Sequence, residues 1–93
     1  MKIAYVRVSS ADQNEARQVE ALKKYDIEKW FVEKVSGKDM NRPELQRLLE
    51  FAREGDTVYV KDFSRLARST KDLLEIVESL NKRNIHVVSN KEN

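Results

Sequence analysis

Residues 3–8 read Ile-Ala-Tyr-Val-Arg-Val (IAYVRV), a short run of β-forming residues interrupted by one charge, Arg7. Apolar side chains at successive positions are typical of a strand that is covered on both faces, as in parallel sheets. Three further short runs of this kind follow at 30–35, 57–61 and 85–89. Helical patterns, with apolar residues three and four apart, separate the four runs. This order predicts an α/β fold: one four-stranded parallel sheet with helices on both faces.

Capping residues and helix breakers mark the ends that we expect for the helices. Residues 10–13 (SADQ) have the spacing of a capping box, and residues 69–72 (STKD) have a similar start. Pro43 suits the first turn of the helix between the second and third strands, and Gly55 is well placed to end that helix. Asn84 is expected to cap the last helix.

Composition limits the classes of function. The 93 residues allow one small domain. The absence of cysteine excludes a disulfide scaffold, a thiolate metal site and a Cys nucleophile. A single histidine, His86, disfavours His-pair zinc sites, and the two glycines, Gly37 and Gly55, cannot form the phosphate loops of ATP- and dinucleotide-binding proteins. No run approaches the roughly 18 apolar residues of a membrane span, so we expect a soluble cytoplasmic protein.

Charged and hydroxyl side chains gather at the carboxyl ends of the expected strands, where parallel α/β sheets bind their ligands. Arg7 and Ser9 end the first strand, and Arg42 directly precedes Pro43. The segment after the third strand carries four cations, Lys61, Arg65, Arg68 and Lys71. Because the same segment also contains Asp62 and Asp72, its net charge is +2, equal to that of the whole chain. The positive charge is therefore concentrated where a ligand would bind.

Arginines that converge with a serine at one edge of a sheet suit a phosphodiester substrate. Guanidinium groups bind phosphate oxygens in pairs, keep their charge, and would stabilise a pentacoordinate transition state. Arg65 and Arg68 are three apart, so we expect one short helical turn to project both from one face. Taken singly, Arg7 could be a strand-end arginine that reaches water, and Ser9 could be a helix cap.

Three segments resemble the sequence signatures of serine recombinases of the resolvase/invertase type. Residues 5–9 (YVRVS) resemble the Y-x-R-V-S signature of that family. Residues 35–37 (VSG), with Arg42 a few positions on, resemble a second signature. Residues 60–69 (VKDFSRLARS) are similar to the D-R-L-x-R-[ST] block. The resemblance covers almost the whole chain, and it implies that residues 1–93 form the family's parallel α/β catalytic core.

The resemblance also implies a function, that of a site-specific DNA recombinase. Ser9 would attack a DNA phosphodiester, form a 5′-phosphoseryl bond and release a 3′-hydroxyl, with no metal or other cofactor. The residues that would contact the scissile phosphate, or support those contacts, are Arg7, Arg42, Arg65 and Arg68. The residues that would position the site are Gln13, Gln18 and Ser36. Lys61 and Lys71 would bind DNA.

The chain departs from the family pattern in two respects. The aspartate expected directly before Arg65 is Ser64 here, so the resemblance assigns no group that protonates the leaving oxygen. The family's long dimer helix and C-terminal DNA-binding domain cannot be identified in residues 1–93. We therefore expect a truncated core, inactive alone, which acts on double-stranded DNA as a homodimer and as a tetramer in the full-length synaptic complex.

Two other functions are alternatives to recombination. A non-catalytic relative would dimerise or bind DNA weakly, with salt-sensitive affinity that does not depend on Ser9. A response-regulator-like domain would have the same α/β layout. It is excluded because Arg7 stands where such a domain needs an acidic cluster to hold Mg²⁺.

Overall fold

A computed structural model of the chain describes residues 1–9, 15–35, 42–67 and 69–90. The strands are β1 (Lys2–Ser9), β2 (Lys29–Val35), β3 (Thr57–Val60) and β4 (His86–Ser89). The helices are α1 (Glu15–Leu22), α2 (Pro43–Phe51), α3 (Phe63–Leu66) and α4 (Thr70–Lys82), and a 3-10 turn, η1 (Lys23–Tyr25), follows α1. The predicted α/β fold is confirmed.

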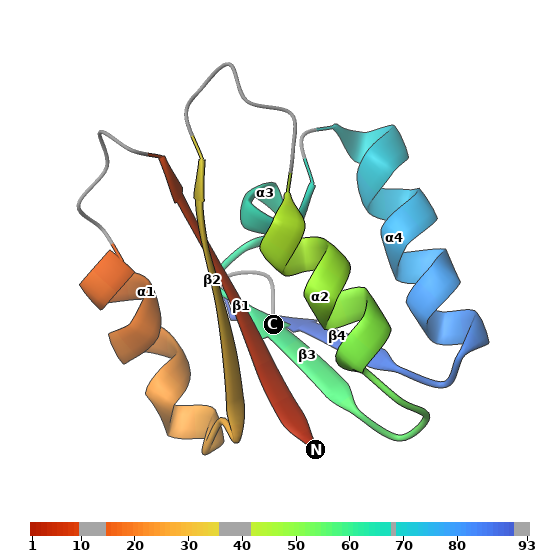
Figure 1. Ribbon diagram of the computed structural model, residues 1–93, viewed down its shortest axis with the longest axis horizontal. Coiled ribbons are helices and arrows are strands. Elements are labelled where there is room, and N and C mark those ends of the chain that lie inside the picture. The colour runs from red at the N-terminus through yellow and green to blue at the C-terminus, as the bar shows by residue number, and fades with distance from the viewer. Residues whose placement is uncertain (10–14, 36–41, 68, 91–93) are drawn as a thin grey trace.

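The four strands form one sheet in the order β2-β1-β3-β4, and each neighbouring pair is parallel. Helix α1 covers one face, and α2, α3 and α4 lie on the other (Figure 1). Because the strands run in one direction, their carboxyl ends share one side of the sheet, which we call the carboxyl edge. The opposite side, where the chain begins, is the amino edge. No helix in the described ranges is long and apolar enough to cross a membrane.

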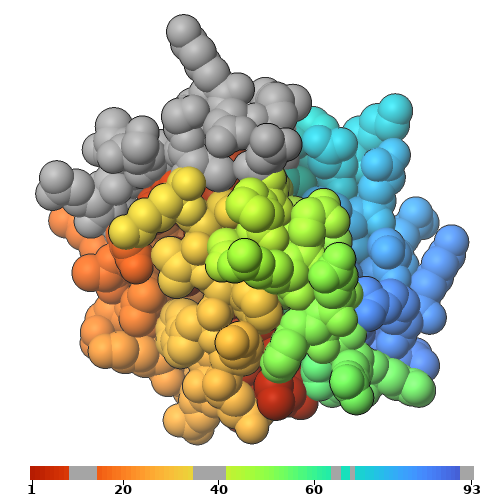
Figure 2. Space-filling model, in the orientation of Figure 1, coloured from red at the N-terminus to blue at the C-terminus, as the bar shows by residue number. Residues whose placement is uncertain are grey.

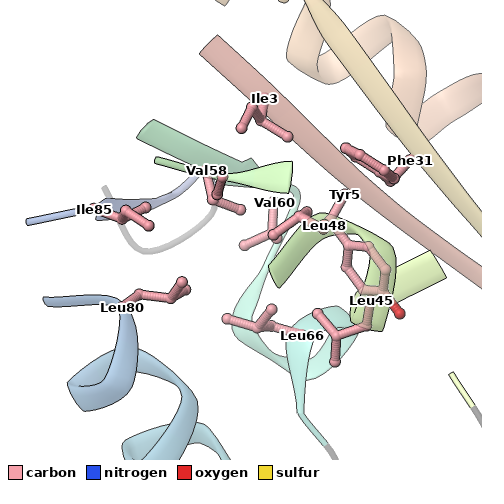
Figure 3. Close-up of a cluster of buried hydrophobic side chains, with 11 residues drawn as sticks. Ile3, Tyr5, Phe31, Leu45, Leu48, Val58, Val60, Leu66, Leu80 and Ile85 are labelled. Atoms are coloured by element: carbon pink, nitrogen blue, oxygen red, sulfur yellow. The ribbon is translucent and has the colours of Figure 1, made fainter. Parts of the chain in front are cut away.

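Strand β1 divides the hydrophobic core into two clusters. Ile3 and Tyr5 face the cluster under α2, α3 and α4, which Figure 3 shows, whereas Ala4 and Val6 face the cluster under α1. None of these four side chains has any exposed surface. Full burial of a large apolar side chain stabilises a fold by about 1.5–3 kcal/mol. Burial on both faces therefore explains why the run that predicted this strand is apolar at successive positions.

Several of the predicted helix ends are confirmed. The hydroxyl of Ser69 accepts a hydrogen bond from the backbone N–H of Asp72 at 3.2 Å, and α4 begins at the next residue, Thr70. Pro43 is the first residue of α2. Asn84 follows α4 with a left-handed backbone (φ 59°), which Asn tolerates better than most residues. The capping box predicted at 10–13 lies outside the described residues.

The prediction that Gly55 ends α2 is wrong. That helix ends at Phe51, because Ala52 is extended (φ −67°, ψ 143°) and leaves the helical path. Gly55 instead lies in the turn before β3, where its φ of 92° requires a residue without a side chain. Its N–H donates to the carbonyl of Asn84 at 2.9 Å, which ties this turn to the end of α4.

The N-terminus is held at the amino edge by Asp56, which is 8% exposed. The α-ammonium group of Met1 donates to Oδ1 of Asp56 at 2.9 Å, and the backbone N–H of Arg53 donates to Oδ2 at 2.8 Å. Burial acts to raise the pKa of Asp56. The hydrogen bonds from Arg53 and the ammonium group outweigh it and hold the pKa below its ordinary value of 3.8. Asp56 thus joins the first residue of the chain to the turn before β3.

Replacing Asp56 with asparagine tests this anchor. We expect Asp56→Asn to lower the free energy of unfolding by about 1–3 kcal/mol at neutral pH, because hydrogen bonds to a charged group are lost. A lowered pKa in the folded state stabilises the fold fully above 3.8, and that stabilisation is lost as the pH falls through the folded-state pKa. Urea unfolding should therefore show the difference between parent and variant shrinking in acid.

Asp26→Asn is the matched control, because Asp26 is exposed and has a left-handed backbone (φ 56°) that asparagine also adopts. We expect its stability to stay within about 0.5 kcal/mol of the parent at neutral pH. An Asp56→Asn deficit that persists unchanged in acid would contradict the role assigned to the Asp56 charge.

Candidate functional site

Three segments that the sequence singled out meet at the carboxyl edge. Strand β1 ends there at Ser9, two residues after Arg7. Helix α2 begins there directly after Arg42. Helix α3, which contains Arg65, follows β3 and lies beside the first turn of α2 (Figure 1). The fold thus brings together segments that are far apart in the chain: the hydrogen bond from Arg42 to Leu66, for example, spans 24 positions.

A buried carboxylate, that of Glu33, lies between these segments. Glu33 is 2% exposed and is the Cα partner of Arg7 in the β1–β2 register. Its Oε2 accepts a hydrogen bond from the N–H of Glu44 at 3.1 Å, and its Oε1 accepts from the N–H of Leu45 at 3.1 Å and from the hydroxyl of Tyr5 at 3.2 Å. The first N–H groups of a helix have no partner within it. Glu33 therefore caps α2 from a neighbouring strand.

The hydroxyl of Tyr5 is kept protonated by its surroundings. Burial is the main cause that raises its pKa, and the negative charge of Glu33 raises it further, whereas the positive charges of Arg42 and Arg7 oppose the increase. Figure 3 shows the ring of Tyr5 against the first turn of α2, beside Leu45. The opposing charges do not overcome burial and Glu33, so the hydroxyl remains a hydrogen-bond donor to Glu33.

Arg42 connects the start of α2 to the end of α3. Its Nη1 donates a hydrogen bond to the carbonyl oxygen of Leu66, the last residue of α3. Its Nη2 is buried and has no hydrogen-bond partner among the residues that the structure describes. One nitrogen of the guanidinium group is thus bonded to the protein, and another is a donor without a partner in the described part of the chain.

The expected shared turn for Arg65 and Arg68 is wrong. Helix α3 ends at Leu66, and the N–H of Ala67 donates to the carbonyl of Phe63 at 3.2 Å to close a single turn. Ala67 itself is extended (φ −143°, ψ 156°), so the helical turn that contains Arg65 ends before Ala67. Arg68 lies outside the described residues, as do Gln13 and Ser36.

Gln18 joins α1 to the end of β1. Its side chain is fully buried, and its Nε2 donates to the carbonyl oxygen of Arg7 at 3.0 Å. This bond fixes the backbone two residues before Ser9. The two lysines that are predicted to bind DNA lie on either side of α3 in the sequence. Lys61 follows β3 and is half-buried, and Lys71 is exposed in the first turn of α4.

Sequence reasoning missed Glu33. The signal was present, because Glu33 is a charged residue within an expected buried strand, just as Arg7 is in β1. A charge of each sign near the carboxyl ends of two expected strands suggests that the strands are neighbours. However, which strands are neighbours depends on their order in the sheet, and the amino-acid sequence alone does not give that order.

Replacing Glu33 with glutamine should destabilise the fold. The carboxamide presents an N–H group to partners that are themselves donors, so at least one buried donor loses its acceptor. We expect the free energy of unfolding to fall by about 2–4 kcal/mol, measured by urea denaturation. Tyr5→Phe, which removes one of the three hydrogen bonds, should cost about 1 kcal/mol.

Glu78→Gln provides the control, since Glu78 is exposed on α4 and should change stability by no more than about 0.5 kcal/mol. If Glu33→Gln is as stable as the control, the carboxylate does not hold these segments together.

Comparison with known proteins agrees with this geometry. The family model "Resolvase, N terminal domain" matches residues 2–93. The chain is 48% identical over 86 residues to the Transposon Tn21 resolvase of Escherichia coli, an alignment that covers 92% of this chain and 45% of that resolvase. The chain therefore spans less than half the length of this relative.

Two solved structures share the fold. The N-terminal catalytic domain of TP901-1 integrase is 30% identical, with a TM-score of 0.78 over 99% of this chain and 78% of that one. A serine recombinase from Sulfolobus solfataricus is 26% identical, with a TM-score of 0.75 over 95% of this chain and 66% of that one. By sequence and by structure, this chain belongs to the resolvase family of serine recombinases and corresponds to its N-terminal domain.

Proposed function

We propose that this chain is the catalytic core of a site-specific DNA recombinase, which cleaves and rejoins DNA through a covalent bond to Ser9. The observation that carries the proposal is the hydrogen bond from Arg42 to Leu66. It joins the second and third signature segments at the edge where the first segment ends. Membership of the resolvase family supports the reaction class, because relatives are named resolvases and recombinases.

The proposed reaction begins with attack of the Ser9 hydroxyl oxygen on the phosphorus of a DNA phosphodiester. Ser9 gives up its hydroxyl proton as the bond between phosphorus and the 3′ oxygen breaks, and the leaving oxygen takes up one proton to become a 3′-hydroxyl, so no net proton is gained or lost. The 5′-phosphoryl group stays on the protein as a serine ester. Rejoining reverses these steps with a 3′-hydroxyl as the nucleophile. One phosphoester bond is exchanged for another at each step, so no nucleotide is consumed.

The arginines would stabilise the charge that develops on the phosphoryl oxygens. Arg42 is suited to this because its Nη1 is bonded to Leu66, which leaves Nη2 as a donor without a partner among the described residues. Arg7 lies two residues before Ser9 on β1, opposite Glu33 in the β1–β2 register. A donor fixed before the reaction needs no reorganisation when the charge forms. We assign the same role to Arg65 and Arg68 by family resemblance.

Other residues would position the site or bind DNA. Gln18 fixes the backbone of Arg7 and hence the end of the strand that carries Ser9. Gln13 and Ser36 are assigned to positioning by resemblance alone. Lys61 and Lys71 flank α3 in sequence, and we propose that they bind DNA phosphates outside the cleaved position.

The proposed partner is double-stranded DNA, bound in the cytoplasm by a homodimer that forms a tetramer during strand exchange. Residues 1–93 would supply the chemistry. A long dimer helix and a DNA-binding domain would come from the rest of a longer protein, as the 45% coverage of Tn21 resolvase suggests. Without those parts, only phosphate contacts remain, so binding should be weak and independent of sequence.

Substitution of Ser9 in a chimera tests the proposal. This chain would replace the matching N-terminal segment of Tn21 resolvase, and the chimera would be incubated with DNA that carries that resolvase's recombination site. We expect a protein–DNA adduct that survives denaturant, with a free 3′-hydroxyl on the cleaved strand. Ser9→Ala should abolish the adduct because the nucleophile is lost, whereas the neighbouring Ser10→Ala should retain it.

Adduct formation by Ser9→Ala would overturn the nucleophile assignment. Salt-sensitive DNA retention by the parent chimera, without any adduct and unchanged by Ser9→Ala, would support a non-catalytic DNA-binding module instead.

Arg42→Lys tests the role of the bound guanidinium group. An ammonium group has no planar fork, so it cannot bond Leu66 and also hold a second donor in a fixed direction. We expect the rate of adduct formation to fall about a hundredfold, as for loss of one transition-state donor, while DNA binding changes little. Arg47→Lys, an exposed residue of α2 that pairs with Glu44, is the control and should keep the parent rate. Equal rates for the two variants would contradict the role of Arg42.

A further inference from the structure

One ion pair at the carboxyl edge has no part in the site described above. The ammonium group of Lys34, in β2, lies 3.4 Å from Oε2 of Glu15, at the start of α1. The side chain of Lys34 is 67% exposed and that of Glu15 is 39% exposed. Figure 2 shows the surfaces of α1, in orange, and of β2, in yellow, next to each other. The pair is therefore open to a ligand that approaches this edge.

The register of the sheet places Lys34 beside the end of β1. Lys34 is the Cα partner of Val8, and the next pair joins Ser9 to Val35. Because neighbouring strands lie about 4.8 Å apart, the backbone of Lys34 is about one strand spacing from the residue before Ser9. Val8 faces the cluster under α1, and Lys34 meets α1 on that same face of the sheet. Arg42 precedes α2, which covers the other face, so cations lie on both faces beside the end of β1.

The pair between Glu15 and Lys34 is of a kind that opens easily. An exposed ion pair contributes little to stability, because water screens both charges and two long side chains must be held in one geometry. A DNA strand carries one phosphate for about every 3.4 Å of the helix axis, and an ammonium group that binds a phosphate releases a counterion from the DNA. A carboxylate so placed therefore competes with DNA phosphates for the same ammonium group.

We propose that Lys34 binds a DNA phosphate next to the cleaved one, and that Glu15 restrains this binding by holding the same ammonium group in the free protein. The proposal rests on the proposed function, because it takes DNA to be bound at the end of β1 that carries Ser9. When DNA binds, Lys34 exchanges the Glu15 carboxylate for a phosphate oxygen. The released carboxylate faces water and the positive N-terminal end of α1, which favours a negative charge. Lys34 thus raises the affinity for DNA, and Glu15 lowers it.

Neutralising each partner of the pair tests the proposal, because the two substitutions should act in opposite directions. The chimera with Tn21 resolvase would carry Ser9→Ala, so that binding to its recombination site is measured without cleavage, by fluorescence anisotropy. At about 50 mM salt, Lys34→Gln should lower the affinity about tenfold and reduce the slope of log affinity against log salt by about 0.9, as for one lost phosphate contact. Glu15→Gln should raise the affinity about threefold, since the exposed pair no longer has to open. In the Lys34→Gln background, Glu15→Gln should have no such effect.

A second ion pair at the other end of α1 provides matched controls. The ammonium group of Lys23 lies 3.4 Å from Oε2 of Glu20, and both side chains are exposed. Lys23 follows the last residue of α1, so this pair is away from the carboxyl edge, where α1 begins. Lys23→Gln and Glu20→Gln make the same charge changes, and each should alter the affinity by less than about twofold. Circular dichroism of each variant checks that the fold is retained.

The outcomes separate this proposal from the proposed cleavage by Ser9. With Ser9 restored and DNA saturating, Lys34→Gln should form the adduct at the parent rate, because Lys34 binds DNA and does not touch the reacting phosphate. A parent chimera that forms no adduct would refute the cleavage and leave the binding comparison intact. Affinity and salt slope of Lys34→Gln equal to those of Lys23→Gln would overturn the role of Lys34. A Glu15→Gln affinity equal to that of Glu20→Gln, or a gain that persists in the Lys34→Gln background, would overturn the role of Glu15.

Discussion

The carboxylate of Glu33 is the interaction on which the arrangement of the carboxyl edge depends. It is almost fully buried, and a buried charge is costly unless it is matched by hydrogen bonds and nearby charges. The fold supplies two backbone N–H groups of α2 and the hydroxyl of Tyr5. The same carboxylate thereby fixes where α2 begins. Arg42, the residue that precedes α2, is positioned as a consequence.

Two further side chains, those of Arg42 and Gln18, hold the rest of the carboxyl edge together. Arg42 reaches α3 through the carbonyl of Leu66, and Gln18 reaches β1 through the carbonyl of Arg7. Each of these contacts joins two different elements of the fold. The edge is therefore a set of chain segments held by buried polar side chains, on a core of apolar strands. The opposite edge is held in the same way by Asp56, which binds the N-terminal ammonium group.

The fold could be predicted from the sequence because it depends on local patterns. The apolar run at 3–8 identifies a strand buried on both faces, and Ser69 and Pro43 identify helix starts by their own chemistry. Gly55 misled the prediction because a glycine near the end of a helix can serve either as a cap or in a later turn. Only the hydrogen bond from Gly55 to Asn84, a contact between distant residues, selects the turn.

The candidate site could be predicted only in part, because local motifs identify residues but do not give their contacts. Arg7, Arg42 and Gln18 were identified by motif, but what they contact depends on how strands and helices assemble. The role of Glu33 requires that β1 and β2 be neighbours and in register. The expected turn through Arg65 and Arg68 failed because helical spacing was assumed beyond Leu66, where the backbone becomes extended.

Amide hydrogen exchange at Glu44 and Leu45 tests the central claim most directly. The N–H groups in the first turn of a helix normally exchange fast, because they have no partner within the helix. If the Glu33 carboxylate caps α2, these two amides should exchange about as slowly as the amides of buried β1, and they should lose that protection in Glu33→Ala. Fast exchange at both amides in the parent chain would contradict the account.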